Sequence, residues 1–114
     1  YNENMRRINK IQFITKLIMH EVDKACPQIN YVEKVNPKNI YKGVLTGIER
    51  AFSSSMDFPP KSLLDREKSA AAEITFHLQR KNFHQIQLEV EDLIDLTSNL
   101  EPNQYEYEDD DLPF

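Results

Sequence analysis

The sequence predicts a mostly α-helical fold, a small bundle of about four helices with a flexible acidic C-terminal tail. Three observations support this class. Apolar residues recur at steps of three and four, the 114 residues include only 2 glycines, and no Asn-Gly or Asp-Gly hairpin signal is present. A closed β-barrel is therefore not expected. We predict two parts, a helical domain over residues 1–100 and a flexible tail over residues 101–114.

The first helix is predicted over residues 4–25, where apolar residues fall on one face. They are Met5, Ile8, Ile11, Ile14, Leu17, Ile18 and Val22. Pro27 ends this helix, because proline disfavours helical geometry at the preceding residue. Residues 28–36 are expected to form a connector or a short extended piece. The apolar face can also pack against a second copy, so a homo-oligomer and a monomeric bundle are both open.

The second helix is predicted over residues 37–52. Asn36 has the side chain of an N-cap, and Pro37 fits the first helical position, where its missing N–H is no loss. Gly43 and Gly47 lie four residues apart inside this helix. Each glycine costs about 1 kcal/mol relative to alanine. A tight helix–helix contact would offset that cost, and chance spacing is the alternative.

The chain breaks at residues 53–60, which contain Ser-Ser-Ser and Phe-Pro-Pro. A third helix is predicted after the break, capped by Ser62 and reaching about residue 81. Asn82 with Gln85 resembles a capping box and predicts a fourth helix that runs to about residue 99. Part of this fourth segment also alternates like a strand, at Ile86, Leu88 and Val90.

Charge is distributed unevenly along the chain, whose net charge is -5. Six of the 19 acidic residues lie within residues 101–114, which contain no base. Residues 1–100 therefore carry 13 acids against 14 bases and are nearly neutral. This asymmetry is typical of an interaction tail, and it does not exclude nucleic-acid binding by the helical domain.

Disulfide, membrane and metal-dependent classes are not expected. Cys26 is the single cysteine, which favours a reducing, cytoplasmic compartment. The longest apolar stretch, residues 13–19, is far shorter than the roughly 20 residues that cross a bilayer, so no membrane partner is predicted. His20, His77 and His84 lie on three different predicted helices and lack metal-ligand spacing. We therefore predict no metal site and no cofactor.

An enzymatic function is also not expected. The sequence contains no glycine-rich phosphate loop and no nucleophile elbow, so no catalytic residue is predicted. Several carboxylates cluster in the fourth predicted helix and are interpreted as a solvated face. They are Glu89, Glu91, Asp92 and Asp95.

Three sets of basic residues form a candidate nucleic-acid-binding surface. They are Arg6, Arg7 and Lys10, then Lys38 and Lys42, and finally Arg80 and Lys81. Such residues can contact phosphates, with Tyr31, Tyr41 or Phe83 available to stack on bases. The alternative is ordinary solubilising charge.

The extreme C-terminus carries the most specific pattern, an acidic run that ends in apolar residues. It comprises Asp109, Asp110, Asp111, Leu112, Pro113 and Phe114. These six residues resemble the acidic tip of bacterial single-stranded DNA-binding proteins, whose tails end in Asp-Asp-Asp-Ile/Leu-Pro-Phe. The resemblance implies that the tip recruits replication, recombination and repair proteins. It further implies that Phe114 fills an apolar pocket, its α-carboxylate meets a basic side chain, and the aspartates steer toward a basic rim.

The resemblance does not extend upstream, because that family has a β-barrel where residues 1–100 are predicted to be helical. The sequence therefore favours an accessory protein of DNA replication, recombination or repair, from a bacterium or its phage or plasmid. Its helical domain would bind single-stranded DNA or a replisome component, and its tip would recruit proteins that bind the single-stranded DNA-binding protein tip. The alternative is a helical protein–protein interaction adaptor with no nucleic-acid role.

Overall fold

A computed structural model describes the backbone of residues 3–26 and 36–105 and the side chains of residues 4–26 and 36–98. The elements are α1 (Glu3–Ala25), α2 (Pro37–Ile48), the π-helical turn η2 (Glu49–Ser53), α3 (Lys61–Gln79) and α4 (Phe83–Tyr105). No β-strand occurs in these two ranges, and the predicted helical class is confirmed. None of the described helices is both long and apolar enough to cross a membrane.

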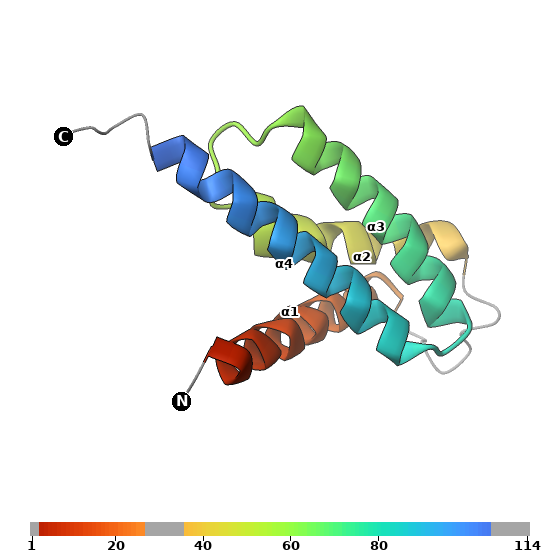
Figure 1. Ribbon diagram of the computed structural model, residues 1–114. Coiled ribbons are helices and arrows are strands. Elements are labelled where there is room, and N and C mark those ends of the chain that lie inside the picture. The colour runs from red at the N-terminus through yellow and green to blue at the C-terminus, as the bar shows by residue number, and fades with distance from the viewer. Residues whose placement is uncertain (1–2, 27–35, 106–114) are drawn as a thin grey trace.

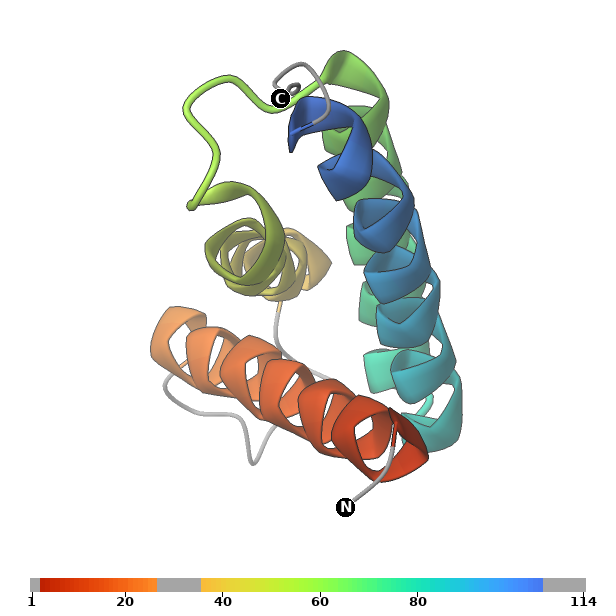
Figure 2. The ribbon, with the colours of Figure 1, turned by 60° about the vertical axis from the view of Figure 1, so that its left-hand side comes forward.

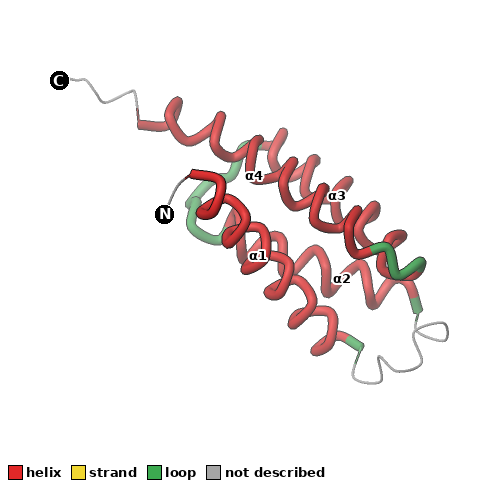
Figure 3. The backbone as a smooth tube through the Cα atoms, turned by 60° about the horizontal axis from the view of Figure 1, so that its bottom comes forward, coloured by secondary structure: helices red, strands yellow, loops and turns green. Residues whose placement is uncertain are grey.

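The helices form two pairs that face each other (Figures 1 and 2). Helix α1 packs on α2 and α3 packs on α4, while α2 also contacts α3 and α1 also contacts α4. Within the described ranges, the chain outside the helices consists of loops that connect or end them (Figure 3). The core lies between the two pairs and includes Ile18, Val22, Val44, Ile48, Ile74, Ile86, Val90 and Leu93.

The two glycines of α2 lie directly against the backbone of α1. A Cβ atom at Gly43 would lie 2.8 Å from the Cα of Val22, and one at Gly47 would lie 2.7 Å from the Cα of Ile18. Both distances are shorter than any ordinary carbon–carbon contact. Of the two alternatives that the glycine spacing left open, the tight helix–helix contact is therefore the one present. Because the higher-numbered glycine meets the lower-numbered residue, α1 and α2 are antiparallel.

The predicted start of α2 is confirmed. The Asn36 side-chain oxygen accepts a hydrogen bond from the Lys38 backbone N–H at 2.9 Å, and Pro37 occupies the first turn. The end of this helix differs from the prediction, because the last five residues form the π-helical turn η2. The Ser54 N–H donates to the Glu49 carbonyl, five residues earlier, at 2.8 Å. The wider turn leaves Ser53 buried.

Helix α3 begins and ends earlier than predicted. The N-cap is Pro60 rather than Ser62, which is an exposed residue within the first turn. At the other end, Lys81 adopts a left-handed conformation with a φ of 58°. Its N–H donates to the Leu78 carbonyl at 3.0 Å, and the next N–H donates to the His77 carbonyl at 2.9 Å. This hydrogen-bond pattern is a Schellman motif, so the helix stops at Gln79 although no glycine marks the site.

Helix α4 starts at Phe83, directly after Asn82, as predicted, but it continues to Tyr105. Its backbone therefore extends five residues into the segment that was predicted to be a flexible tail. The strand alternative for this segment is wrong. Ile86 and Val90 are both fully buried and lie four residues apart, which is the spacing of one helical face.

The apolar face of α1 is only partly buried. Ile14, Ile18 and Val22 lie in the core, whereas Met5 and Ile8 are 48% and 49% exposed. The register of the glycine contact explains this difference, since α2 ends before it reaches the first turns of α1. Helix α4 lies beside that part of α1, as Figure 2 shows.

We predict that Gly47→Ala destabilises the protein, although alanine favours helices by about 1 kcal/mol. The added methyl group must displace the backbone of Ile18, and overpacking of this kind costs about 1–3 kcal/mol. Chemical denaturation monitored by circular dichroism measures the free energy of unfolding. Asn39→Ala, at an exposed position of the same helix, is the control and should not destabilise. A Gly47→Ala variant as stable as the wild type would contradict the proposed contact.

Candidate functional site

The structure does not join the three predicted basic sets into one surface. Lys10 lies near the start of α1, whereas Lys42 precedes Gly43, whose neighbour is Val22. Val22 is 12 residues beyond Lys10, or about 18 Å along the helix axis at 1.5 Å per residue. Arg6 and Lys38 lie still nearer to the opposite ends of this helix pair. A single strand of DNA would therefore meet two separate patches here rather than one continuous track.

Arg7 is held by two carboxylates of α4. Its Nε lies 3.0 Å from Glu91 Oε2, and its Nη2 lies 2.6 Å from Asp95 Oδ1. Hydrogen bonds to Asp95 and Glu91 raise the pKa of Arg7 above its ordinary value. Contact with a phosphate would compete with these two pairs. The structure therefore gives Arg7 a second role, which is to join α1 to α4.

The third basic set lies at the turn between α3 and α4, together with exposed aromatic side chains. The Arg80 guanidinium carbon lies 4.5 Å from the centre of the Phe76 ring. Phe76 is 48% exposed, and Phe83, on the other side of the turn, is 54% exposed. Lys81 is exposed within the turn itself. This combination of bases and aromatic rings best matches the expected chemistry of single-stranded nucleic-acid contact.

The other predicted stacking residues do not add to this group. Tyr41 is half-buried against the core, and Tyr31 lies outside the described residues. Phe76 was missed by the sequence analysis because it falls in a regular helical pattern. Only its exposure distinguishes it from a core residue.

The α4 carboxylates do more than form a solvated face: Glu91, Asp92 and Asp95 are 36%, 61% and 54% exposed, whereas Glu89 is 18% exposed. Besides the two pairs with Arg7, the Arg66 Nη2 lies 3.5 Å from Glu89 Oε1 and 3.6 Å from Asp92 Oδ2. Each of the four carboxylates therefore pairs with an arginine of another helix. The register between helices decides this pairing, and α4 alone does not reveal it.

A shallow apolar groove of about 190 Å³ lies between the first half of α1 and the first half of α4. Its lining includes Ile8, Ile11, Gln12, His84, Gln87 and Leu88. Two of its apolar members, Ile8 and Leu88, are 49% and 39% exposed. Exposed apolar side chains in one hollow are typical of a contact surface for another protein.

A buried carboxylate lies in the opposite half of the bundle. Glu67 is fully buried, and the Ser53 hydroxyl donates to its two carboxylate oxygens at 3.0 and 2.8 Å. Burial raises the pKa of Glu67, and the hydrogen bond from Ser53 opposes that shift less strongly. No sequence pattern predicted this pair, because it depends on the π-helical turn that buries Ser53.

A second polar cluster joins α3 to α4 near the same turn as Arg80. It consists of Glu73, His77 and Glu89, whose potential ligand atoms lie within 4.8 Å of one another. His77 was expected to be an isolated helix histidine. The spacing of Glu73 and His77, four residues apart, was visible in the sequence, but the approach of Glu89 was not. The other histidines, His20 and His84, are exposed.

The C-terminal tip, residues 109–114, lies outside the described residues. Comparison of the chain with models of protein families, with curated proteins and with solved structures finds no match. Inferences about function therefore depend on the residues themselves.

We predict that Glu67→Gln stabilises the protein at pH 7 by about 1 kcal/mol, because an amide accepts the Ser53 hydrogen bond without a buried charge. The raised pKa means that the folded protein binds a proton more tightly than the unfolded chain does. The stability that this proton contributes is therefore fully present below the pKa of Glu67 in the unfolded chain. It is lost as pH rises through the raised pKa of Glu67 in the folded protein. As pH rises through this range, the denaturation midpoint should fall less steeply for Glu67→Gln than for the wild type.

The matched control for this prediction is Asp57→Asn, at an exposed loop carboxylate. It should leave the wild-type pH dependence in place. If Glu67→Gln and the wild type lose stability in parallel as pH rises, then the ionisation of Glu67 does not cause the pH dependence.

A further prediction concerns Arg7. Arg7→Ala should lower Tm, because it leaves Glu91 and Asp95 without their shared partner, and high salt should reduce the difference by screening. Lys10→Ala, at an exposed position on the same helix, should leave Tm unchanged. Differential scanning calorimetry at low and high salt measures both. Equal Tm values for the two variants would contradict the structural role of Arg7.

Proposed function

We propose that this protein is an accessory factor of DNA replication, recombination or repair in a bacterium or its phage or plasmid, and that it recruits partners through residues 109–114. The observation that carries the proposal is the agreement of all six terminal residues with the tip of bacterial single-stranded DNA-binding proteins. Such a role would be cytoplasmic.

The chemistry of the tip supports specific recognition at a chain terminus. By the resemblance, Phe114 would provide an apolar ring and a free α-carboxylate beside it. A pocket that binds both groups can distinguish a terminal phenylalanine from an internal one. Asp109, Asp110 and Asp111 add three negative charges that accelerate encounter with a basic surface.

The helical domain supports this proposal because its last helix leads toward the tip. Helix α4 ends at Tyr105, at an outer end of the bundle in Figure 1, and the tip begins four residues later. The separation of the basic sets and the pairing of Arg7 argue against one extended DNA track on this domain. We propose that any contact with single-stranded DNA is weak and occurs at the α3–α4 turn, through Arg80, Lys81 and the aromatic rings beside them.

One observation favours the adaptor function as a second candidate. The groove between α1 and α4 exposes Ile8 and Leu88, which can contact another protein or a second copy of this chain. In that function the tip and the groove would bind two proteins, and DNA would have no part. Binding of single-stranded DNA at low salt, lost as salt rises, separates the two candidates.

We predict that the full chain displaces a labelled single-stranded DNA-binding protein tip peptide from purified proteins that bind this tip. Removal of Phe114 should weaken displacement tenfold or more, since burial of a phenylalanine ring contributes about 1.5–3 kcal/mol and the charge-assisted contact adds to it. Fluorescence polarisation measures the displacement.

Two further variants serve as matched controls. One added residue after Phe114 keeps the ring but moves the carboxylate, and it should be nearly as damaging as the deletion. Neutralising Asp109, Asp110 and Asp111 should act mainly on the association rate and its salt dependence. Equal displacement by the wild type, the deletion and the extension would show that the terminal resemblance is accidental.

A further inference from the structure

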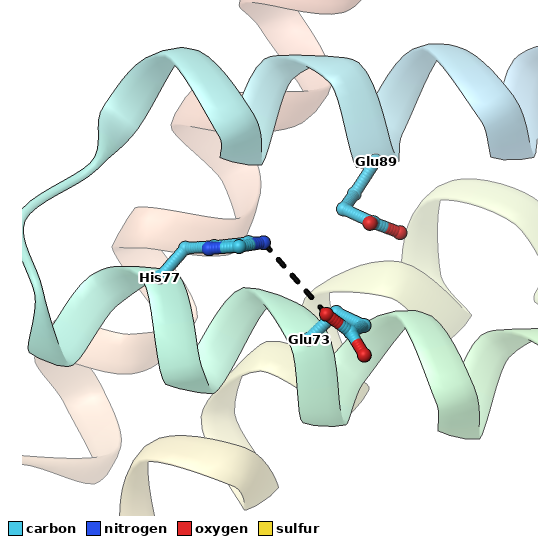
Figure 4. Close-up of side chains that lie close together, drawn as sticks. All are labelled: Glu73, His77 and Glu89. Carbon is cyan, nitrogen blue, oxygen red and sulfur yellow. Dashed lines mark ion pairs between the residues drawn. The ribbon is translucent and has the colours of Figure 1, made fainter.

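Three side chains from two helices converge near the α3–α4 turn (Figure 4). Glu73 and His77 lie one helical turn apart on α3, and Glu89 approaches them from α4. The His77 Nε2 lies 3.8 Å from Glu73 Oε1. Each residue offers one ligand atom, and the three atoms lie within 4.8 Å of one another.

The three side chains differ in exposure, and the difference suits a bound ion. The His77 and Glu89 side chains are only 15% and 18% exposed, whereas that of Glu73 is 58% exposed. Two ligands are thus held by packing, and the third can close over the ion from the solvent side. The Phe76 ring meets the His77 imidazole edge-on, with 5.6 Å between ring centroids, and limits its rotation.

The His77 imidazole makes no hydrogen bond to the described part of the chain, because its 3.8 Å separation from Glu73 is too long for one. Its Nε2 faces the Glu73 carboxylate, so a metal ion between the two groups would bind both. Tetrahedral bonds of 2.0–2.1 Å place ligand atoms about 3.4 Å apart, and the three ligand atoms here lie within 4.8 Å of one another.

Arg66 is the competing cation at this cluster. Its Nη2 lies 3.5 Å from Glu89 and 3.6 Å from Asp92, so both contacts are long. Asp92 is 61% exposed and can keep Arg66 when Glu89 turns to a metal ion.

We propose that Glu73, His77 and Glu89 form a binding site for one divalent transition-metal ion of the Zn²⁺ class. One imidazole and two carboxylates match the ligands of zinc, whereas Mg²⁺ and Ca²⁺ prefer oxygen alone. Three protein ligands leave a fourth position for water. A bound ion would connect α3 to α4 beside the turn that carries Arg80 and Lys81, and would stabilise that end of the bundle.

The test is a Zn²⁺ titration of the full chain in competition with a chromophoric chelator, with Co²⁺ absorption as a report on geometry. We expect one saturable site, and a higher Tm when Zn²⁺ is bound. Glu73→Gln and His77→Gln should each weaken binding at least about tenfold, which is the smallest loss seen even for residues outside the ligand shell. Glu73→Gln is the decisive variant, because an exposed glutamate can be replaced without unfolding the protein.

Matched controls use the two exposed histidines and the acidic tail. His20→Gln, His84→Gln, and joint replacement of Asp109, Asp110 and Asp111 by asparagine should each leave the affinity unchanged. The proposal is overturned if Zn²⁺ shows no saturable binding, or if any control weakens binding as much as Glu73→Gln does.

Discussion

The fold depends on the contact between the backbones of α1 and α2 at Gly43 and Gly47. No side chain larger than hydrogen fits at these positions, since a Cβ atom would lie within 2.8 Å of an α1 backbone atom. The contact fixes the register of the first helix pair. That register leaves the first turns of α1 beyond the end of α2, where the groove that Ile8 lines lies between α1 and α4.

Ion pairs then join α4 both to α1, in the other helix pair, and to α3, in its own pair. Arg7 connects α1 to Glu91 and Asp95 of α4, and Arg66 connects α3 to the same helix. Exposed pairs of this kind contribute little stability each, but they favour one alignment over others. The alignment brings Glu89 beside His77 and produces the proposed metal site. The two arginines that form these ion pairs have their positive charge offset by the carboxylates beside them.

Local signals predicted most of the fold and little of the site. The Asn36 cap was predicted correctly, because a cap acts on the backbone within a few residues, and the contact at Gly43 and Gly47 was one of two alternatives that their spacing left open. The end of α3 was not predicted correctly, because Lys81 adopts a left-handed conformation that usually requires glycine. The Ser53–Glu67 pair and the approach of Glu89 to His77 depend on helix register, which no local pattern encodes.

We propose that the tip, rather than a face of the bundle, selects the partner. Nuclear magnetic resonance measures this directly, by titrating the ¹⁵N-labelled full chain with a purified protein that binds the single-stranded DNA-binding protein tip. We expect the backbone amide signals of residues 109–112 and of Phe114 to shift or broaden while those of α1 to α3 stay in place. Shifts along the α1–α4 groove, with the signals of Leu112 and Phe114 unchanged, would show that a face of the bundle selects the partner.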